Sequence, residues 1–138
     1  MLDETDLRIL SLLLVNSRRQ WREIGEEVHL TGQAVANRIR KMEDMGLIEG
    51  YTVRIDEKLL GRPLLAFITV FMKTANHQAF HRFIDQQQLI IRANQISGEG
   101  CYLLEVRSSS QDELRTLLEE VLKFGNYRVN LSLGQLKG

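Results

Sequence analysis

The sequence predicts an α+β protein in which a helical N-terminal part precedes a part that mixes strands and helices. Two observations support this fold class. Up to about Gly46 the apolar residues recur every three to four positions, as they do along one face of a helix. Beyond Gly46 they begin to alternate with polar residues, and after Pro63 strand-like and helix-like stretches follow one another. We therefore expect three helices followed by a β-α-β-β-α-β unit.

Three short helices are expected within the first 46 residues. Asp3 can cap the first helix with its side-chain oxygen, and Gly46 supplies the positive φ at which helices commonly end. Residues 29–32 separate the second helix from the third and contain Thr31, a favourable N-cap. The expected apolar faces are Leu7, Leu10 and Leu14, then Trp21, Ile24 and Val28, then Val35, Ile39 and Met42. Three helices with a tight turn before the third have the outline of a helix-turn-helix.

The second half of the chain predicts four strands and two helices. Residues 64–72 are almost wholly apolar, which suits a buried strand. Asn76 can cap one helix, and Ser110 with Glu113 has the spacing of a capping box at the start of another. Further strands are expected at residues 90–96, 102–106 and 129–133. This order is that of a ferredoxin-like sandwich.

The boundary between the two parts is expected between about residues 50 and 63, where composition and periodicity change together. This stretch contains Gly61 and the only proline, Pro63, which both tend to interrupt helices and strands. We expect a helix-turn-helix domain over residues 1–50, a linker or hinge strand over 51–63, and a ferredoxin-like domain over 64–138.

The composition indicates a soluble protein without a strong overall electrostatic field. Its 138 residues include 18 Lys+Arg and 18 Asp+Glu, so any attraction to nucleic acid must come from a local patch. The single cysteine, Cys101, cannot form an internal disulfide, which favours a reducing compartment. The short apolar run near the start is interrupted by Arg8 and Ser11, so we expect neither a membrane span nor a signal peptide. A cytoplasmic protein is the simplest expectation.

The third predicted helix carries a polar face suited to DNA. From Gln33 to Lys41 it has three basic residues and no acidic one. Amide side chains can donate and accept at an adenine edge, whereas Arg and Lys reach guanine or phosphate. Arginines near the start of the second helix can add phosphate contacts. The residues expected at DNA are Arg18, Arg19, Arg22, Thr31, Gln33, Ala34, Asn37, Arg38, Arg40 and Lys41.

The same pattern leaves alternatives open. A polar helix face is also typical of a solvated helical subdomain, and acidic neighbours such as Glu43 and Asp44 weaken long-range attraction to DNA. A metabolite-sensing module that controls a partner protein through its helices is a second alternative. Catalysis is not expected, because no nucleophile is paired with a base and no phosphate-cradling glycine loop is present. His77 and His81 are four residues apart, but two ligands do not make a metal site, so we expect neither metal nor cofactor.

Essentially the whole chain resembles the leucine-responsive regulatory protein family, also called Lrp/AsnC. The resemblance is carried by residues 2–10, by the helix at 21–30 and by residues 31–48, TGQAVANRIRKMEDMGLI, followed by Glu49-Gly50-Tyr51 and the β-α-β-β-α-β unit. In that family the first domain binds DNA, the second mediates dimers and often octamers, and amino acids bind between dimers as effectors. The resemblance implies a transcriptional regulator that reads the major groove with its third helix as a dimer or higher oligomer. It also allows an architectural protein that wraps DNA.

The family's effector loop resembles residues 96–104. Many members carry an aromatic residue and then an aspartate where this chain has Gly100 and Cys101. A thiol is mostly uncharged at neutral pH and cannot replace a carboxylate as the partner of an ammonium group. Backbone amides near the glycines can still receive a ligand carboxylate, and Glu99 can compensate only if it turns inward. The candidate effector residues are Gly98, Glu99, Gly100 and Cys101.

Dimerisation is also expected on physical grounds. A small sheet with helices on one face leaves the other face apolar at alternate positions, and a second copy commonly buries it. The residues expected at that interface are Ala66, Ile68, Val70, Leu104 and Val106.

Overall fold

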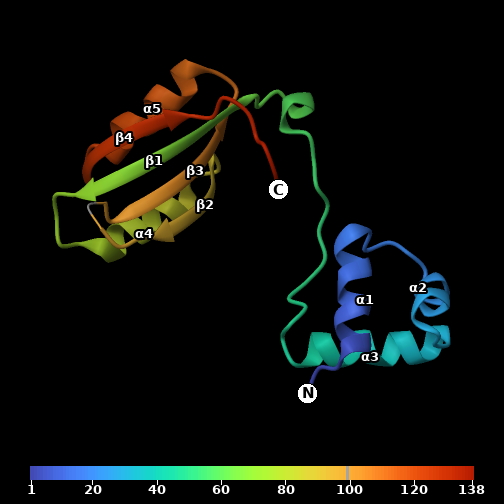
Figure 1. Ribbon diagram of the computed structural model, residues 1–138. Helices are drawn as coiled ribbons and strands as arrows, with labels where there is room; N and C mark the ends of the chain where they lie inside the picture. The colour runs from blue at the N-terminus through green and yellow to red at the C-terminus, as the bar shows by residue number, and fades with distance from the viewer. Residues whose placement is uncertain (99) are drawn as a thin grey trace. The chain divides into compact units, whose positions relative to one another are not determined.

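The computed structural model describes residues 1–98 and 100–138, and these divide into two compact units. The first unit spans Met1–Arg54 and the second spans Ile55–Gly138. The first unit is helical, whereas the second contains a four-stranded sheet and its helices (Figure 1). This order of elements confirms the predicted α+β fold class.

The first unit consists of α1 (Glu4–Val15), α2 (Trp21–Val28) and α3 (Gly32–Asp44). The Asp3 side chain caps α1 by accepting the backbone N–H of Asp6 at 2.8 Å. The Thr31 hydroxyl caps α3 by accepting the backbone N–H of Ala34 at 3.1 Å. The buried core of the unit is formed by Ile9, Leu13, Ile24, Val35, Ile39 and Met42.

The apolar faces predicted for the first two helices are partly wrong. In α1 the buried stripe begins at Asp6 and continues through Ile9 and Leu13, whereas Leu7 and Leu14 are exposed. The run of apolar residues in α1 is nearly continuous, so its period alone does not select one face. In α2, Trp21 is 49% exposed although it has helical spacing with Ile24.

The turn between α2 and α3 is tight. His29 ends α2 in the left-handed region with a φ of 60°, and the Gly25 carbonyl accepts the backbone N–H of Leu30 at 2.9 Å. Gly25 is buried, and a Cβ at this position would collide with the Leu30 carbonyl oxygen. The absence of a side chain at Gly25 therefore allows the chain to turn closely into α3.

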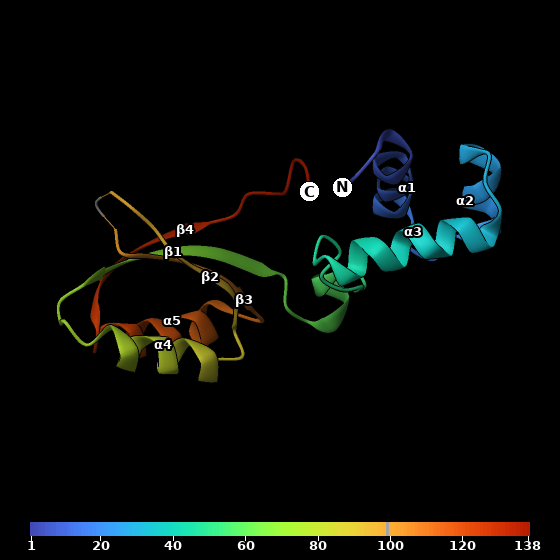
Figure 2. The ribbon, with the colours of Figure 1, turned by 90° about the horizontal axis from the view of Figure 1, so that it is seen from below.

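The second unit has the ferredoxin-like topology. A short 3-10 helix, η1 (Glu57–Leu60), precedes β1 (Leu64–Met72), α4 (His77–Gln86), β2 (Ile90–Gln95), β3 (Tyr102–Ser108), α5 (Gln111–Val121) and β4 (Gly125–Leu131). The sheet is antiparallel with strand order β2-β3-β1-β4. Both α4 and α5 cover the same face of this sheet (Figure 2).

The last strand begins earlier than predicted, at Gly125, and ends at Leu131. Gly125 pairs with Met72 and is buried against the backbone of Phe71, where a Cβ would not fit. The glycine therefore extends the pairing back to the turn that follows α5. The alternating pattern at residues 129–133 identified the strand but not its start.

The predicted dimer residues lie on the opposite face of the sheet from the one expected. They are buried in the core together with Phe80, Phe83, Leu114, Leu117 and Val121 of α4 and α5. Alternation along a strand defines two faces, but it does not state which face the helices cover. The residues that take their place on the other face are Leu65, Phe67, Thr69 and Phe71 of β1 with Leu103 of β3, all half-buried. We call this second set the open face.

Candidate nucleic-acid interface

Helix α3 presents three lengthwise stripes, because each residue advances by about 100°. The buried stripe consists of Val35, Ala36, Ile39 and Met42. We call the opposite positions, Gln33, Asn37, Arg40 and Asp44, the outer stripe. The positions between them on one side, Ala34, Arg38, Lys41 and Met45, form the side stripe. The buried stripe fixes α3 to the core and leaves the outer stripe exposed.

The outer stripe offers hydrogen-bonding groups in a defined arrangement. Gln33 Nε2 donates to Asn37 Oδ1 at 3.1 Å, which orients the two amides toward each other. The Gln33 carbonyl oxygen and the Asn37 amino group remain for an external partner. Arg40 forms no ion pair with any described residue, so its guanidinium is also available. An acceptor, a donor and a cation on one exposed stripe are the groups that read base edges.

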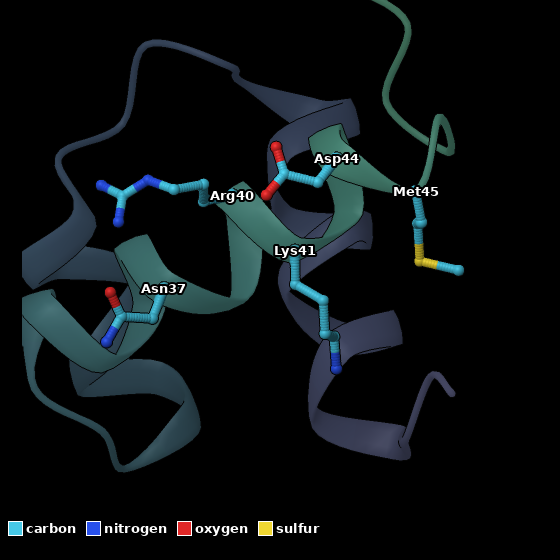
Figure 3. Close-up of a pocket in the computed structure, with 5 residues that line it drawn as sticks. All are labelled: Asn37, Arg40, Lys41, Asp44 and Met45. Carbon is cyan, nitrogen blue, oxygen red and sulfur yellow. The ribbon is translucent and has the colours of Figure 1, made fainter.

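Figure 3 shows the C-terminal half of this surface. Asn37, Arg40, Lys41, Asp44 and Met45 line a shallow depression of about 480 Å³. In the view, Arg40 and Lys41 extend in different directions, and Lys41 runs alongside α1. This open surface suits contact with a large partner better than enclosure of a small molecule.

The two cations of the side stripe, Arg38 and Lys41, form ion pairs with carboxylates of the protein itself. Arg38 Nη1 donates to both oxygens of Asp3 at 2.8 Å and to Asp6 Oδ1 at 3.1 Å. Lys41 Nζ donates to Asp6 Oδ2 at 2.6 Å. From the sequence, Asp3 is expected only as a cap, and Asp6 has no predicted role. Asp6 is separated by more than 30 positions from both cations, so sequence spacing carried no signal of this cluster.

Asp6 is an ionised carboxylate with no exposed surface. Burial by itself raises the pKa of Asp6, but hydrogen bonds from Lys41, from the Asp3 backbone and from Arg38 lower this pKa to about 2. The hydrogen bond from Arg38 likewise lowers the pKa of Asp3, and the bond to Asp3 raises the pKa of Arg38. Both carboxylates of the cluster are therefore ionised in the neutral and mildly acidic range.

The free energy of unfolding of the first unit is expected to fall as the solution becomes acidic. An unfolded aspartate has a pKa of about 3.9, whereas folded Asp6 has a pKa of about 2. The stabilisation is complete above the unfolded pKa and is lost as the pH falls through the folded one. Urea unfolding at pH values from roughly 6 down to 2 measures this dependence. The variant Asp6→Asn should show a flatter dependence, and equal slopes for the two proteins would contradict the assignment.

The predicted flanking arginines have different surroundings. The Arg18 and Arg22 side chains are exposed and form no ion pair with a described residue. Arg19 is paired with Glu27 at 3.0 Å. Arg18 and Arg22 are therefore the better placed of the three to meet an anion.

The candidate effector residues lie at the connection between β2 and β3. Gly98 has a φ of 95°, Gly100 is buried, and a Cβ on Gly100 would collide with the Thr69 side chain. Cys101 is half-buried, and its backbone N–H donates to the Val70 carbonyl at 2.8 Å. Glu99 lies outside the described residues, so its predicted role stays a prediction. A side chain at Gly100 would therefore require the Thr69 side chain to move.

The two histidines of α4 contact the hydroxyl of Tyr102, a tyrosine whose sequence position gives no sign of this contact. The Tyr102 hydroxyl lies 2.6 Å from His77 Nδ1 and 2.9 Å from His81 Nε2. Burial raises the pKa of Tyr102, with a further contribution from Cys101. Among the described residues, no group of three or more His, Cys, Asp or Glu side chains is arranged to hold a metal ion. The arrangement is a hydrogen-bonded cluster at the start of α4.

Comparisons with known proteins agree with this architecture. A model of the AsnC-type helix-turn-helix domain matches residues 2–43, and a model of the Lrp/AsnC ligand binding domain matches residues 65–138. The transcriptional regulator LrpB of Bacillus subtilis is 46% identical over 136 residues, which are 99% of this chain and 91% of the relative.

Solved structures show the same fold. The structure of LrpC from Bacillus subtilis has a TM-score of 0.94 and 26% identity, and the match covers 99% of this chain and 98% of that chain. A transcriptional regulator from Neisseria meningitidis in complex with L-Met has a TM-score of 0.93 and 24% identity, and the match covers 100% of this chain and 94% of that chain. Among the residues that the structure describes, no helix is both long enough and apolar enough to span a membrane.

A helix-turn-helix with an exposed polar stripe on its third helix, followed by a ferredoxin-like unit, defines a class of two-domain DNA-binding regulators. The two domain models together cover most of the chain. The chain belongs to the Lrp/AsnC family of transcriptional regulators.

Proposed function

We propose that the chain regulates transcription as a homodimer, or as an oligomer of dimers up to an octamer, whose α3 helices enter the DNA major groove. The observation that carries this proposal is the outer stripe, which presents two amides and a guanidinium, with Asp44 at its C-terminal end, on a helix packed against a buried core. Two-fold symmetry would place the two helices on pseudo-palindromic half-sites about one helical turn apart, or a multiple of it. Its place of action would be nucleoid DNA in the cytoplasm.

We assign the roles at DNA from the chemistry of each side chain. The amide pair of Gln33 and Asn37 suits an adenine, because that base offers one acceptor and one donor in the major groove. Arg40 suits guanine or a phosphate, and Arg18 and Arg22 suit phosphates. Of the remaining predicted contacts, Arg19, Thr31 and Ala34 lie close to α2 and the start of α3.

Selection of bound duplexes from sheared genomic DNA, with and without the common amino acids, tests the proposed function. We expect a short two-fold symmetric motif and an affinity that falls steeply as salt rises. Long phased protection in a footprint of the selected DNA would indicate wrapping instead of a local half-site. No enrichment over random duplex under any of these conditions would reject the proposal.

The open face supports the homodimer. It presents half-buried apolar side chains from β1 and β3 on the side away from α4 and α5. We expect Phe67→Asp to weaken dimerisation by at least about tenfold, because it would place a charge within an apolar interface. Sedimentation across a concentration series measures the shift. Gln78→Asp at an exposed position of α4 is the matched control, and equal dimerisation of Phe67→Asp and this control would exclude the open face as the interface.

The second unit is further proposed to bind an amino acid. Its match to a ligand binding domain supports this proposal, as does the Neisseria meningitidis relative in its complex with L-Met. The backbone around Gly98 and Gly100 is the candidate contact for the ligand carboxylate. Thermal melting in the presence of each amino acid tests it, since a ligand of the folded state raises the melting temperature. If no amino acid at millimolar concentration shifted the melting temperature, amino acids would be rejected as effectors of this regulator.

A further inference from the structure

The two cations of the side stripe of α3 form a cluster with two carboxylates from the start of the chain. Arg38 and Lys41 both contact the buried Asp6, and Arg38 also contacts Asp3. The formal charges of these four groups cancel. The outer stripe has no such internal partners for Arg40 among the described residues.

We propose that Asp6 is a positioning residue for DNA recognition, which holds the side stripe of α3 against the start of α1 so that Arg38 and Lys41 neutralise carboxylates of the protein instead of DNA phosphates. The inference rests on the proposed function and divides α3 into a reading stripe and an anchoring stripe. It replaces the sequence-based expectation that Arg38 and Lys41 touch DNA.

The carboxylates of the cluster are held before any DNA arrives. Asp6 accepts the backbone N–H of Asp3 at 3.0 Å, and Asp3 accepts the backbone N–H of Asp6 at 2.8 Å. This reciprocal capping box fixes both side chains relative to the α1 backbone. Each ion pair with α3 therefore also sets the rotation of α3 about its own axis.

Burial makes the ion pairs difficult to exchange. If Arg38 and Lys41 turned toward phosphates, the fully buried Asp6 would keep its charge without a cationic partner. An uncompensated buried charge is strongly unfavourable, and charge-assisted hydrogen bonds of 2.6 to 3.1 Å would be lost as well. DNA phosphates could therefore bind Arg38 and Lys41 only by breaking ion pairs that are already formed in the folded unit.

The salt dependence of DNA binding separates this role from direct contact, because each neutralised phosphate contributes about 0.9 to the slope of log affinity against log salt. We compare Lys41→Gln, Asp6→Asn and Arg40→Gln with the wild type on the selected duplex and on a random duplex. Lys41→Gln should leave both slopes unchanged. Asp6→Asn should release cations to phosphates, which steepens the random-duplex slope by about one to two per protomer and lowers the ratio of specific to random affinity by about tenfold.

A fall in slope of about one per protomer for Lys41→Gln would overturn the inference, and so would an unchanged slope for folded Asp6→Asn. A purely structural role of Asp6 predicts weaker binding to both duplexes without the steeper slope. If Asp6→Asn does not fold, Lys41→Gln decides alone, since its side chain is 43% exposed. Arg40→Gln checks the proposed function separately: loss of affinity there together with a reduced slope in Lys41→Gln rejects only the anchoring stripe.

Discussion

Replacing Asn37 and Arg40 together with alanine is expected to weaken binding to the selected duplex by about a hundredfold. Each side chain that reads a base edge contributes about 1–3 kcal/mol of discrimination, and about 3 kcal/mol for the pair corresponds to this factor. Both residues are exposed on the outer stripe, so the fold should tolerate the change. Fluorescence anisotropy with the selected and a random duplex measures the loss.

The double variant needs a control that also removes a cation. Arg82→Ala suits this purpose because Arg82 is an exposed residue of α4 in the second unit. Its melting temperature and duplex affinity should match the wild type. An unchanged affinity of Asn37→Ala/Arg40→Ala, with an intact melting curve, would show that the outer stripe does not read DNA.

The second large effect is expected at the turn into α3. Gly25→Ala should destabilise the first unit by about 3 kcal/mol, because the added Cβ collides with the backbone carbonyl of Leu30 and the turn must open. Opening the turn displaces α3, so duplex binding should fall together with stability. Hydrogen exchange of the α2 and α3 amides, with urea unfolding, measures both the site and the size of the effect.

Gly50→Ala is the matched control for this glycine. Within the described part of the chain, no atom outside its chain neighbours lies within 4 Å of a Cβ built at Gly50, and its φ is not in the left-handed region. Its exchange rates should therefore resemble those of the wild type. Wild-type protection of α2 and α3 in Gly25→Ala would mean that the turn relaxes without cost.

The sequence predicted the elements better than their orientation. Caps at Asp3, Thr31, Asn76 and Ser110 are local, involving residues three positions apart, and all four are present. Which face of α1 is buried depends instead on tertiary contacts, because its run of leucines satisfies more than one helical stripe. The same limit applies to the sheet, where alternation gave two faces without naming the one that α4 and α5 cover.

The candidate interface was predicted in part for a related reason. Helical spacing alone places Gln33, Asn37 and Arg40 on one stripe opposite the core. It does not reveal that Arg38 meets Asp3 and Asp6, because these contacts join segments distant in sequence. An acidic residue in the first turn of a helix is ordinarily a favourable charge at the helix dipole, and Asp6 has that pattern. Its burial becomes visible only once α1 and α3 are packed together.

The most direct measurement of the central claim is a comparison of the sequence motifs that the wild type and Asn37→Ala select from one random duplex library. If the outer stripe of α3 reads bases, the variant should lose preference at one position in each half-site, an adenine by the amide chemistry, while the spacing of the half-sites stays the same. Two identical motifs would contradict the account.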